Sequence, residues 1–379
     1  MDVVRFNFPT CILFGPGARR KLTGLLRAEG KSRPLFISDR GVAALGFFSE
    51  LVTDAANAGF DAGTFSEVTA NPAASQVAAG AEVCRAHGAD AVVLVGGGAA
   101  LDVGKAVALM AHHPGNVFDY EDGKPDALPV DREMPWIVAI PTTSGTGSEV
   151  GRCSVISDDA THIKRIIFSP RLLPSVVLAD PELTLELPPA LTAATGIDAL
   201  SHNVEAFLST GFHPMCDGIA LEAIRLIAGN LVACYREPSN IEARANMMAA
   251  STMGAVAFQK GLGVVHSCAH ALSAVTDMHH GLANGLMMVP AMKFNKAAVP
   301  ERLARMASAA GTKAVPGAFI TWIQRLLKDL DFPEGLSGAG VSKEQIPALV
   351  ETALQDGCHT SNPRPVGRND FKALFRAAM

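Results

Sequence analysis

Two residues with the chemistry of metal ligands stand four positions apart in the second half of the chain. Asp198 and His202 lie in Thr195–Ser209, a stretch of helical composition. Residues four apart project from one face of an α-helix, so a carboxylate and an imidazole would lie side by side. The spacing predicts part of a metal site.

A second group of histidines follows further along the chain. His266 and His270 repeat the four-residue spacing within Gly263–Thr276, and His279 and His280 come soon after. One carboxylate and three imidazoles suit Fe²⁺, Zn²⁺ or another first-row divalent ion, and the net positive charge that remains makes a Lewis acid. The residues between His266 and His270 include no glutamate, which a zinc protease needs as its general base, so this type of hydrolysis is disfavoured.

A glycine-rich loop in the first half could bind a phosphate group. Gly96-Gly97-Gly98 follows the apolar run Val92–Val95 and precedes a helical pattern from Ala99. The glycines let the backbone approach a phosphate, and the next helix offers unpaired N–H groups at its N-terminus. Leu101 stands where the G-x-G-x-x-G fingerprint has its third glycine, so a structural turn explains this loop equally well.

Two further polar segments follow apolar runs. Pro141–Ser148 is rich in hydroxyl groups and follows Trp136–Ile140, so it could donate hydrogen bonds to phosphate or ribose; a turn with a helix cap is the alternative. Asp39 follows Pro34–Ser38, where a carboxylate could accept a hydrogen bond from a ribose hydroxyl of NAD. Capping of a local turn would also explain Asp39.

The elements that must position these residues change type along the chain. The first half alternates β-branched runs with helical patterns. The predicted buried strands are Pro34–Asp39, Ala91–Val95, Trp136–Ile140 and Ser175–Asp180, and the predicted helices include Ala73–His87 and Ala99–His112. This alternation predicts a doubly wound parallel sheet, which binds ligands beyond the carboxyl ends of its strands.

After about Pro189 the β-branched runs stop, and Ala-, Leu- and Met-rich segments of helical length continue to the C-terminus. The second half is therefore predicted to be an all-α domain. The prolines from Pro181 to Pro189 mark a boundary, and we expect a dinucleotide-binding α/β domain over residues 1–185 and a helical metal-binding domain over residues 186–379. Two domains also suit a chain of 379 residues.

Composition narrows the class of partner. The chain is 49% hydrophobic and 18% charged, with a formal net charge of −5 and no cluster of Lys or Arg. Nucleic acids and anionic membranes need a positive surface, so we expect neither as a partner and expect a small molecule instead.

Cysteine usage and the apolar segments bear on the compartment. The seven cysteines are scattered and form no C-x-x-C pair, which suits free thiols in a reducing environment. Met1–Thr10 lacks the apolar core of a signal peptide, and we expect no stretch of about 20 apolar residues that could span a bilayer. The sequence predicts a cytoplasmic protein.

Four ordered motifs resemble those of the iron-containing, or group III, alcohol dehydrogenases. They are Gly96-Gly97-Gly98 with Asp102 and Lys105, Pro141–Glu149 (PTTSGTGSE), Thr195–Glu205 (TGIDALSHNVE) and Gly261–Asn284 (GLGVVHSCAHALSAVTDMHHGLAN). This family has an N-terminal Rossmann-like α/β domain and a C-terminal helical domain, with the metal in the cleft between them. The resemblance implies a metal-dependent, NAD(P)-linked alcohol dehydrogenase or aldehyde reductase that acts on a small alcohol or aldehyde and forms a homo-oligomer, a dimer.

The resemblance also implies roles for particular residues. The implied metal ligands are Asp198, His202, His266 and His280, with Fe²⁺ as the ion and Zn²⁺ as the alternative. His270 is the implied proton-relay group beside them. The implied cofactor contacts are Asp39, Asn71, Gly97, Gly98, Asp102, Thr142, Thr143, Thr146 and Lys164, with NAD expected and NADP as the alternative.

Some positions depart from the residues usual in the family. Ala99 replaces a common Ser, which removes a hydroxyl but leaves the backbone donors of the loop. His279 replaces a Pro, and Gln259-Lys260 replaces an Asn-Ala pair, which leaves the substrate open. Lys260 either attracts an acidic substrate or serves as a cation at a helix end.

Four alternative functions remain at this point. Reductases of the maleylacetate or glycerol dehydrogenase type are close relatives. A lyase resembling dehydroquinate synthase would share the general fold but would normally have a glutamate among its ligands. A non-catalytic nucleotide-binding relative would not need the full Asp-His-His-His set.

Overall fold

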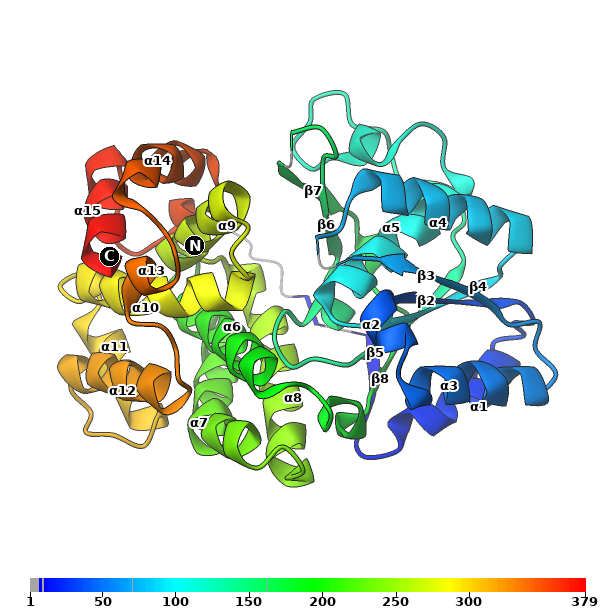
Figure 1. Ribbon diagram of the computed structural model, residues 1–379, viewed down its shortest axis with the longest axis horizontal. Coiled ribbons are helices and arrows are strands. Elements are labelled where there is room, and N and C mark those ends of the chain that lie inside the picture. The colour runs from blue at the N-terminus through cyan, green and yellow to red at the C-terminus, as the bar shows by residue number, and fades with distance from the viewer. Residues whose placement is uncertain (1–6, 9, 70, 162) are drawn as a thin grey trace. The chain divides into compact units, whose positions relative to one another are not determined.

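The computed structural model describes residues 7–8, 10–69, 71–161 and 163–379. Its described residues divide into an α/β unit of residues 10–143 and 147–184, and a helical unit of residues 185–379 together with residues 7–8 and 144–146 (Figure 1). The fold class predicted from the sequence, a parallel α/β unit and an all-α unit, is confirmed. Most of Met1–Thr10, on which the expectation about a signal peptide was based, lies outside the described residues.

The α/β unit is built on a six-stranded sheet in the order β1-β8-β5-β4-β2-β3, and all its paired strands are parallel. Its strands are β1 (Cys11–Phe14), β2 (Pro34–Asp39), β3 (Gly63–Val68), β4 (Ala91–Gly96), β5 (Trp136–Pro141) and β8 (Val176–Ala179). The four strands expected from the β-branched runs are present, while β1 and β3 are additional edge strands. Val95 of β4 pairs with Ser38 of β2 and with Ile140 of β5, so these three strands end together.

Helices cover both faces of this sheet (Figure 1). On one face, α1 (Leu22–Ala28) and α3 (Gly46–Asn57) bury Leu26 and Leu51 in a core with Phe36 and Val93. On the other face lie α4 (Ala74–His87) and α5 (Gly98–His112), both close to their predicted bounds. A Cβ at Gly104 of α5 would lie 2.3 Å from a methyl carbon of Leu94, so this glycine permits close packing of α5 on β4.

Two smaller features complete the α/β unit. The short helix α2 (Arg40–Ala43) follows β2, and an antiparallel hairpin of β6 (Cys153–Ser157) and β7 (Lys164–Phe168) follows β5. The sequence patterns did not predict this hairpin. It places Lys164 opposite Ser157.

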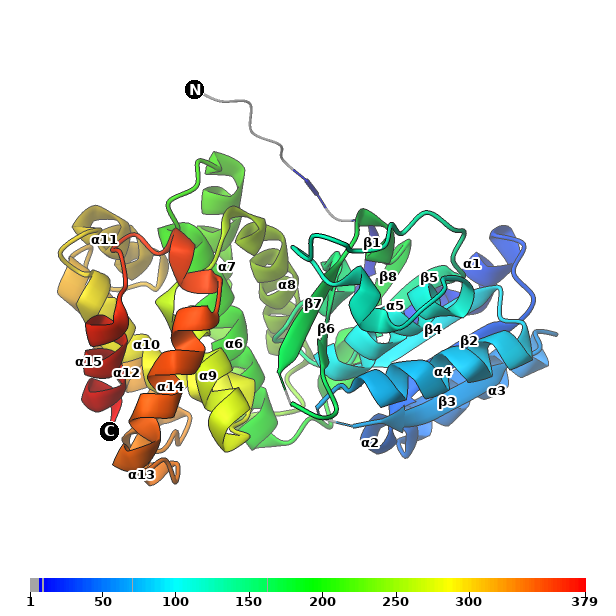
Figure 2. The ribbon, with the colours of Figure 1, turned by 90° about the horizontal axis from the view of Figure 1, so that it is seen from above.

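The helical unit has a core that extends from α6 to the C-terminus. Its helices are α6 (Pro189–Leu208), α7 (Pro214–Arg236), α8 (Ile241–Ala257), α9 (Val264–Thr276), α10 (His280–Asn295), α11 (Pro300–Ala309), α12 (Pro316–Asp329), α13 (Gly335–Gly338), α14 (Ile346–Gln355) and α15 (Arg368–Ala378). Buried along most of its length, α6 packs against α7, α8, α9 and α10 (Figure 2). A Cβ at Gly196 would lie 2.1 Å from Leu231 of α7, so the two backbones approach closely.

One helix differs from the expectation that no segment could span a membrane. By its length and apolar composition, α7 could cross a membrane. These two criteria alone are weak evidence for a membrane span, because the core helix of a globular protein also meets them. Glu222 and Arg225 interrupt its apolar residues with an exposed ion pair, while Ile224 and Ile227 are buried in the core of the helical unit. The buried residues of α7 thus pack in that core, although they make up only a third of its apolar window.

Candidate metal centre

Helix α6 carries two of the four predicted metal ligands. Asp198 and His202 are one helical turn apart, and both side chains are buried. Oδ1 of Asp198 lies 3.9 Å from Nε2 of His202. Because burial of an isolated carboxylate is costly, this arrangement favours a positively charged partner.

The other two predicted ligands come from two further helices. His266 lies in the first turn of α9, and His280 is the first residue of α10. A Cβ at Gly281 would lie 2.1 Å from the carbonyl oxygen of Ala194, so only glycine permits this approach of α10 to α6. The approach brings Nε2 of His280 to 3.4 Å from Oδ1 of Asp198.

The four side chains form a compact donor set. Each offers one ligand atom, and these atoms lie within 4.8 Å of one another. The His202 and His266 rings stack with centroids 4.7 Å apart. Among the described residues, the buried Nε2 of His266 has no hydrogen-bonding partner. One carboxylate and three imidazoles with an open buried nitrogen fit Fe²⁺ or Zn²⁺, and ligation by these residues stays a prediction.

Glu205 links this donor set to the start of α9. Its carboxylate accepts backbone hydrogen bonds from Gly263, Val265 and His266 at 3.0, 2.6 and 3.2 Å. Oε2 of Glu205 also lies 2.7 Å from Nδ1 of His266, which leaves Nε2 as the nitrogen available to a metal. The sequence analysis did not assign Glu205, although its position three residues after His202 places it on the same side of α6.

Burial controls the charge of these groups. It lowers the pKa of both His202 and His266 to about 4, so both imidazoles are neutral at pH 7. Burial also raises the pKa of Glu205 to about 7, against the lowering effect of its backbone hydrogen bonds. Neutral imidazoles have the lone pairs that metal binding requires.

Asn284 is a second residue that the sequence analysis missed. It lies on α10 one turn after His280, and its Nδ2 donates to Oδ1 of Asp198 at 2.8 Å. The same nitrogen is 3.2 Å from Nε2 of His280. Asn284 therefore orients the carboxylate of Asp198 from the side of α10.

His270, the predicted proton-relay residue, lies beside the donor set. Its ring stacks on that of His280 with centroids 5.2 Å apart and meets the ring of His266 edge-on at 6.0 Å. Its Nδ1 lies 2.7 Å from Oδ2 of Asp356, a residue that the sequence analysis did not single out. About a third of the His270 side chain is exposed.

The α/β unit brings five of the predicted cofactor residues together at the carboxyl ends of its central strands. Asp39 ends β2, Gly97 and Gly98 follow β4, and Thr142 and Thr143 follow β5. These three parallel strands are neighbours in the sheet, so their carboxyl ends lie together. Doubly wound sheets bind ligands at the carboxyl ends of their strands.

The glycines at these strand ends allow close approach of the backbone. Gly96 has φ +151°, and a Cβ there would lie 2.6 Å from Cβ of Ala100 and 3.2 Å from Oδ2 of Asp39. A Cβ at Gly97 would lie 3.2 Å from Thr143. Gly97 is also the N-cap of α5, and among the described residues no side chain caps it. The first N–H groups of α5 are thus suited to a phosphate.

Asp39 has two neighbours that matter for its predicted role. Its Oδ1 caps α2 by accepting a hydrogen bond from the Val42 backbone at 2.9 Å, so the turn-capping interaction is present. Its Oδ2 lies on the side of Gly96. The adjacent Arg40 forms an exposed ion pair with Glu67. Oδ1 therefore caps the helix, and contact of Asp39 with a ribose stays a prediction.

Three other predicted cofactor residues lie on separate loops and strands. Asn71 lies in the loop before α4, and Lys164 is the first residue of β7. Ser157, which pairs with Lys164, donates its N–H to the carbonyl of Pro72 at 2.7 Å, so the two segments are neighbours. Thr146 belongs to the short segment that clusters with the helical unit.

Asp102 is held in a buried polar network. Its Oδ1 accepts from Oγ of Ser148 at 2.5 Å and lies 3.0 Å from Nζ of Lys105, while its Oδ2 accepts from the Val155 backbone at 3.0 Å. Both oxygens thus have protein donors. The network ties α5 to β6 and to the hydroxyl-rich loop after β5.

Lys260, considered above as a contact for an acidic substrate, is buried. Its Nζ forms an ion pair with Asp217 at 2.5 Å and donates to the carbonyl of Phe207 at 3.0 Å. Arg302 shares the same Asp217 at 3.1 Å. These contacts favour a role for Lys260 in fixing the helical unit over a role in binding substrate.

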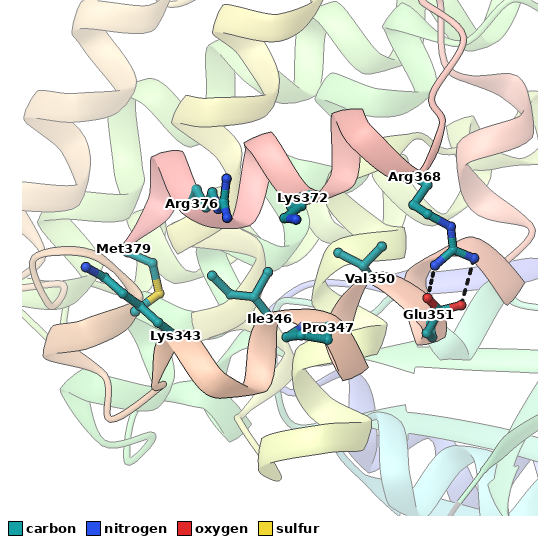
Figure 3. A pocket seen from close by; sticks show the side chains of 9 residues that line it. All are labelled: Lys343, Ile346, Pro347, Val350, Glu351, Arg368, Lys372, Arg376 and Met379. Atoms are coloured by element: carbon teal, nitrogen blue, oxygen red, sulfur yellow. Dashed lines mark hydrogen bonds and ion pairs between the residues drawn. The ribbon is translucent and has the colours of Figure 1, made fainter.

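A groove between α14 and α15 is separate from the predicted ligands and cofactor residues (Figure 3). Its volume is about 660 Å³, and Ile346 and Val350 contribute apolar surface while Lys372 and Arg376 contribute positive charge. Arg368 and Glu351 form an ion pair at one end. None of the predicted site residues lines this groove.

Comparison with known proteins decides the family. Residues 9–181 match the family model for iron-containing alcohol dehydrogenase, and residues 192–379 match the model for the C-terminal part of the Fe-containing alcohol dehydrogenase family. The chain belongs to the iron-containing alcohol dehydrogenase family. The resemblance found in the sequence motifs is confirmed, and the protein is an alcohol oxidoreductase.

Relatives within this family match the chain over nearly its full length. The chain is 38% identical to the 1,3-propanediol dehydrogenase of Citrobacter freundii, over 98% of this chain and 97% of that protein. It is 34% identical to the NAD-dependent methanol dehydrogenase of Bacillus methanolicus, with full coverage of both chains. A crystal structure of 1,3-propanediol oxidoreductase superimposes with a TM-score of 0.95 at 36% identity, with full coverage of both chains.

Proposed function

We propose that this iron-containing alcohol dehydrogenase family member is an NAD-linked enzyme that interconverts a small primary alcohol and its aldehyde. The observation that carries the proposal is the convergence of Asp198, His202, His266 and His280, whose donor atoms lie within 4.8 Å of one another. A divalent ion bound there would act as a Lewis acid toward the substrate oxygen, and the nicotinamide would exchange a hydride with the substrate carbon.

The residues of the chain have distinct tasks in this proposal. Glu205 and Asn284 hold His266 and Asp198 in fixed orientations, so little reorganisation accompanies metal binding. His270 exchanges the hydroxyl proton of the alcohol with solvent, which its partial exposure supports. The alcohol thus loses a hydride to the cofactor and a proton to the protein.

The cofactor proposal rests on the α/β unit. The uncapped start of α5 and the close-packed Gly96 and Gly97 suit a pyrophosphate, and Asp39 suits a ribose that carries a free 2′-hydroxyl. NAD is therefore proposed over NADP. The name of the Bacillus methanolicus relative, an NAD-dependent methanol dehydrogenase, supports the same choice.

The proposal extends to the ion and to the state of the protein. We propose Fe²⁺ as the ion because of the family, with Zn²⁺ as an ion that the same donor set accepts. We also propose a cytoplasmic homodimer whose ligands are small molecules, in keeping with the scattered cysteines and the net charge of −5. Light scattering of the purified protein at several concentrations would measure its mass in solution.

The central experiment measures NADH formation with a panel of alcohols. Protein stripped with a chelator should be inactive, and anaerobic reloading with Fe²⁺, or loading with Zn²⁺ in parallel, should restore absorbance change at 340 nm. We include methanol, ethanol and 1,3-propanediol, and test their aldehydes with NADH. Undiminished turnover by fully stripped protein, or no turnover of any substrate by the loaded protein, would contradict the proposal.

A further inference from the structure

Asp356 forms a hydrogen-bonded pair with His270 next to the predicted metal ligands. Oδ2 of Asp356 lies 2.7 Å from Nδ1 of His270. His270 lies on α9, and Asp356 directly follows α14, which packs against α9. The pair therefore joins two elements of the helical unit that are distant in the sequence.

The second oxygen of Asp356 is also fixed. Its Oδ1 accepts a hydrogen bond from Oγ of Ser267 at 2.6 Å and from the backbone N–H of Cys358 at 2.8 Å. Although burial raises the pKa of Asp356, the hydrogen bonds from His270, Ser267 and Cys358 hold it well below its usual range. Asp356 is thus a rigid, charged acceptor for the Nδ1–H of His270.

We propose that Asp356 is a positioning residue, which holds His270 in the tautomer with its proton on Nδ1 and its lone pair on Nε2. The inference rests on the proposed function, in which His270 accepts the hydroxyl proton of the alcohol. In that step the O–H bond breaks and an N–H bond forms at Nε2, while the hydride leaves the carbon for NAD⁺. The products are a carbonyl compound and NADH, and the proton passes from His270 to solvent. Asp356 keeps its charge throughout and stabilises the imidazolium.

A competing role for this pair is a second metal site, because donor atoms of His270, Asp356 and Cys358 also lie close together. The hydrogen bonds favour the positioning role. Both oxygens of Asp356 already accept from protein donors, and the direct contact with His270 leaves that pair no need of a bridging ion.

The variant Asp356→Asn should change the tautomer of His270 while it keeps the shape of the side chain at position 356. The amide keeps an oxygen for Ser267 and Cys358 but presents an N–H₂ donor to Nδ1 of His270, which forces the proton onto Nε2. We expect kcat to fall about 10²–10⁴-fold with KM within about threefold of wild type, and metal content to be unchanged. The control Asp329→Asn, which removes the same charge from a partly exposed residue elsewhere in the helical unit, should keep wild-type kinetics.

A double-mutant cycle tests whether Asp356 acts through His270. If it does, Asp356→Asn should have almost no further effect on kcat in a His270→Ala background. If the loss in kcat of the double variant equals the product of the two single losses, Asp356 acts independently of His270, and the proposal is overturned. Loss of a second equivalent of metal from Asp356→Asn would assign the pair to a metal site instead.

A spectroscopic measurement tests the proposal even if the proposed function is wrong. Long-range ¹H–¹⁵N spectra of zinc-loaded protein report which imidazole nitrogen carries the proton, and the spectrum of His270→Ala identifies the signals of His270. We expect Nδ1–H in the wild type and Nε2–H in Asp356→Asn. A proton on Nε2 in the wild type would overturn the proposal. Failure of turnover together with the expected tautomer would instead count against the proposed function alone.

Discussion

Oε2 of Glu205 lies 2.7 Å from Nδ1 of His266 and 3.2 Å from the backbone nitrogen of the same residue. One buried carboxylate thus fixes both the ring and the main chain of a predicted metal ligand. Because the partner of a ligating histidine determines which nitrogen faces the metal, Glu205 should contribute to affinity without touching the ion.

We therefore expect Glu205→Gln to bind Zn²⁺ about 10–100-fold more weakly than wild type. The amide weakens the acceptor for Nδ1–H of His266 and brings an N–H₂ group against the backbone donors of α9. Competition with a chromophoric chelator measures the affinity. Glu222→Gln, at an exposed ion pair on α7, is the control and should bind zinc like wild type.

The two histidines of α9 should behave differently when truncated. His266→Ala should lose most bound metal and nearly all turnover, because it removes one of four predicted ligands. His270→Ala should keep its metal but lose about 10²–10⁴-fold in kcat, the usual range for general acid–base catalysis. Metal analysis of both purified variants decides the assignment; metal loss in His270→Ala with metal retained in His266→Ala would reverse it.

Gly281 offers a test that leaves every donor atom in place. A Cβ at this position would lie 2.1 Å from the carbonyl oxygen of Ala194, so Gly281→Ala must push the start of α10 away from α6. We expect His280 to move and metal affinity to fall at least about tenfold. Gly218→Ala on α7, where a Cβ meets nothing within 4 Å, should keep its affinity and gain about 0.4–1 kcal/mol in stability.

The predicted role of Asp39 leads to a test of cofactor preference. Its carboxylate would accept a hydrogen bond from the 2′-hydroxyl of NAD but repel the 2′-phosphate of NADP. Asp39→Gly should narrow the preference for NAD by about tenfold or more, since about 1.4 kcal/mol of repulsion already corresponds to that factor. The measurement is kcat/KM with both cofactors. An unchanged ratio would mean that Asp39 only caps α2.

Buried ionisable groups predict how the metal-free protein responds to pH. His202 and His266 have pKa values of about 4 when folded, so the unfolded chain binds more protons below its histidine pKa of about 6.5. Their contribution to stability is lost as the pH falls from about 6.5 to 4. The pKa of Glu205 is raised to about 7, so its contribution to the free energy of unfolding has the opposite pH dependence. That contribution is lost as the pH rises from about 4.5 to 7.

Glu205→Gln removes the opposing contribution. Between about pH 5 and 6, the free energy of unfolding of the metal-free variant should rise with pH more steeply than that of wild type, by about 1 kcal/mol per pH unit. Urea unfolding of both metal-free proteins at several pH values measures the two slopes. Parallel slopes would show that Glu205 is ionised in the folded protein throughout this range.

The sequence predicted the strands of the sheet centre because they are buried on both faces and read as continuous β-branched runs. It did not predict β1 and β3, which lie at the edges and have partly exposed residues, or the hairpin of β6 and β7, which lies outside the sheet. The pattern of an edge strand is weaker because only part of its surface packs against the core.

The sequence predicted Asp198 and His202 as neighbouring ligands because both lie on one helix, four residues apart. Glu205 and Asn284 were missed because their partners are far along the chain: Glu205 contacts His266, and Asn284 contacts Asp198. Asp356 is equally distant from His270. Such contacts depend on how helices pack, and helical periodicity carries no information about that.

The segment Ser144–Thr146 belongs to the helical unit although the chain on both sides of it belongs to the α/β unit. A Cβ at Gly145 would lie 2.8 Å from Cβ of Thr195, so this segment is fitted closely to α6, the helix that carries Asp198. A gene fusion that exchanged everything before residue 185 would therefore replace the segment that packs on α6 together with the α/β unit. In a chimaera between two relatives, residues 144–146 should therefore come from the same parent as the helical unit. The segment to be exchanged is then not continuous in the gene.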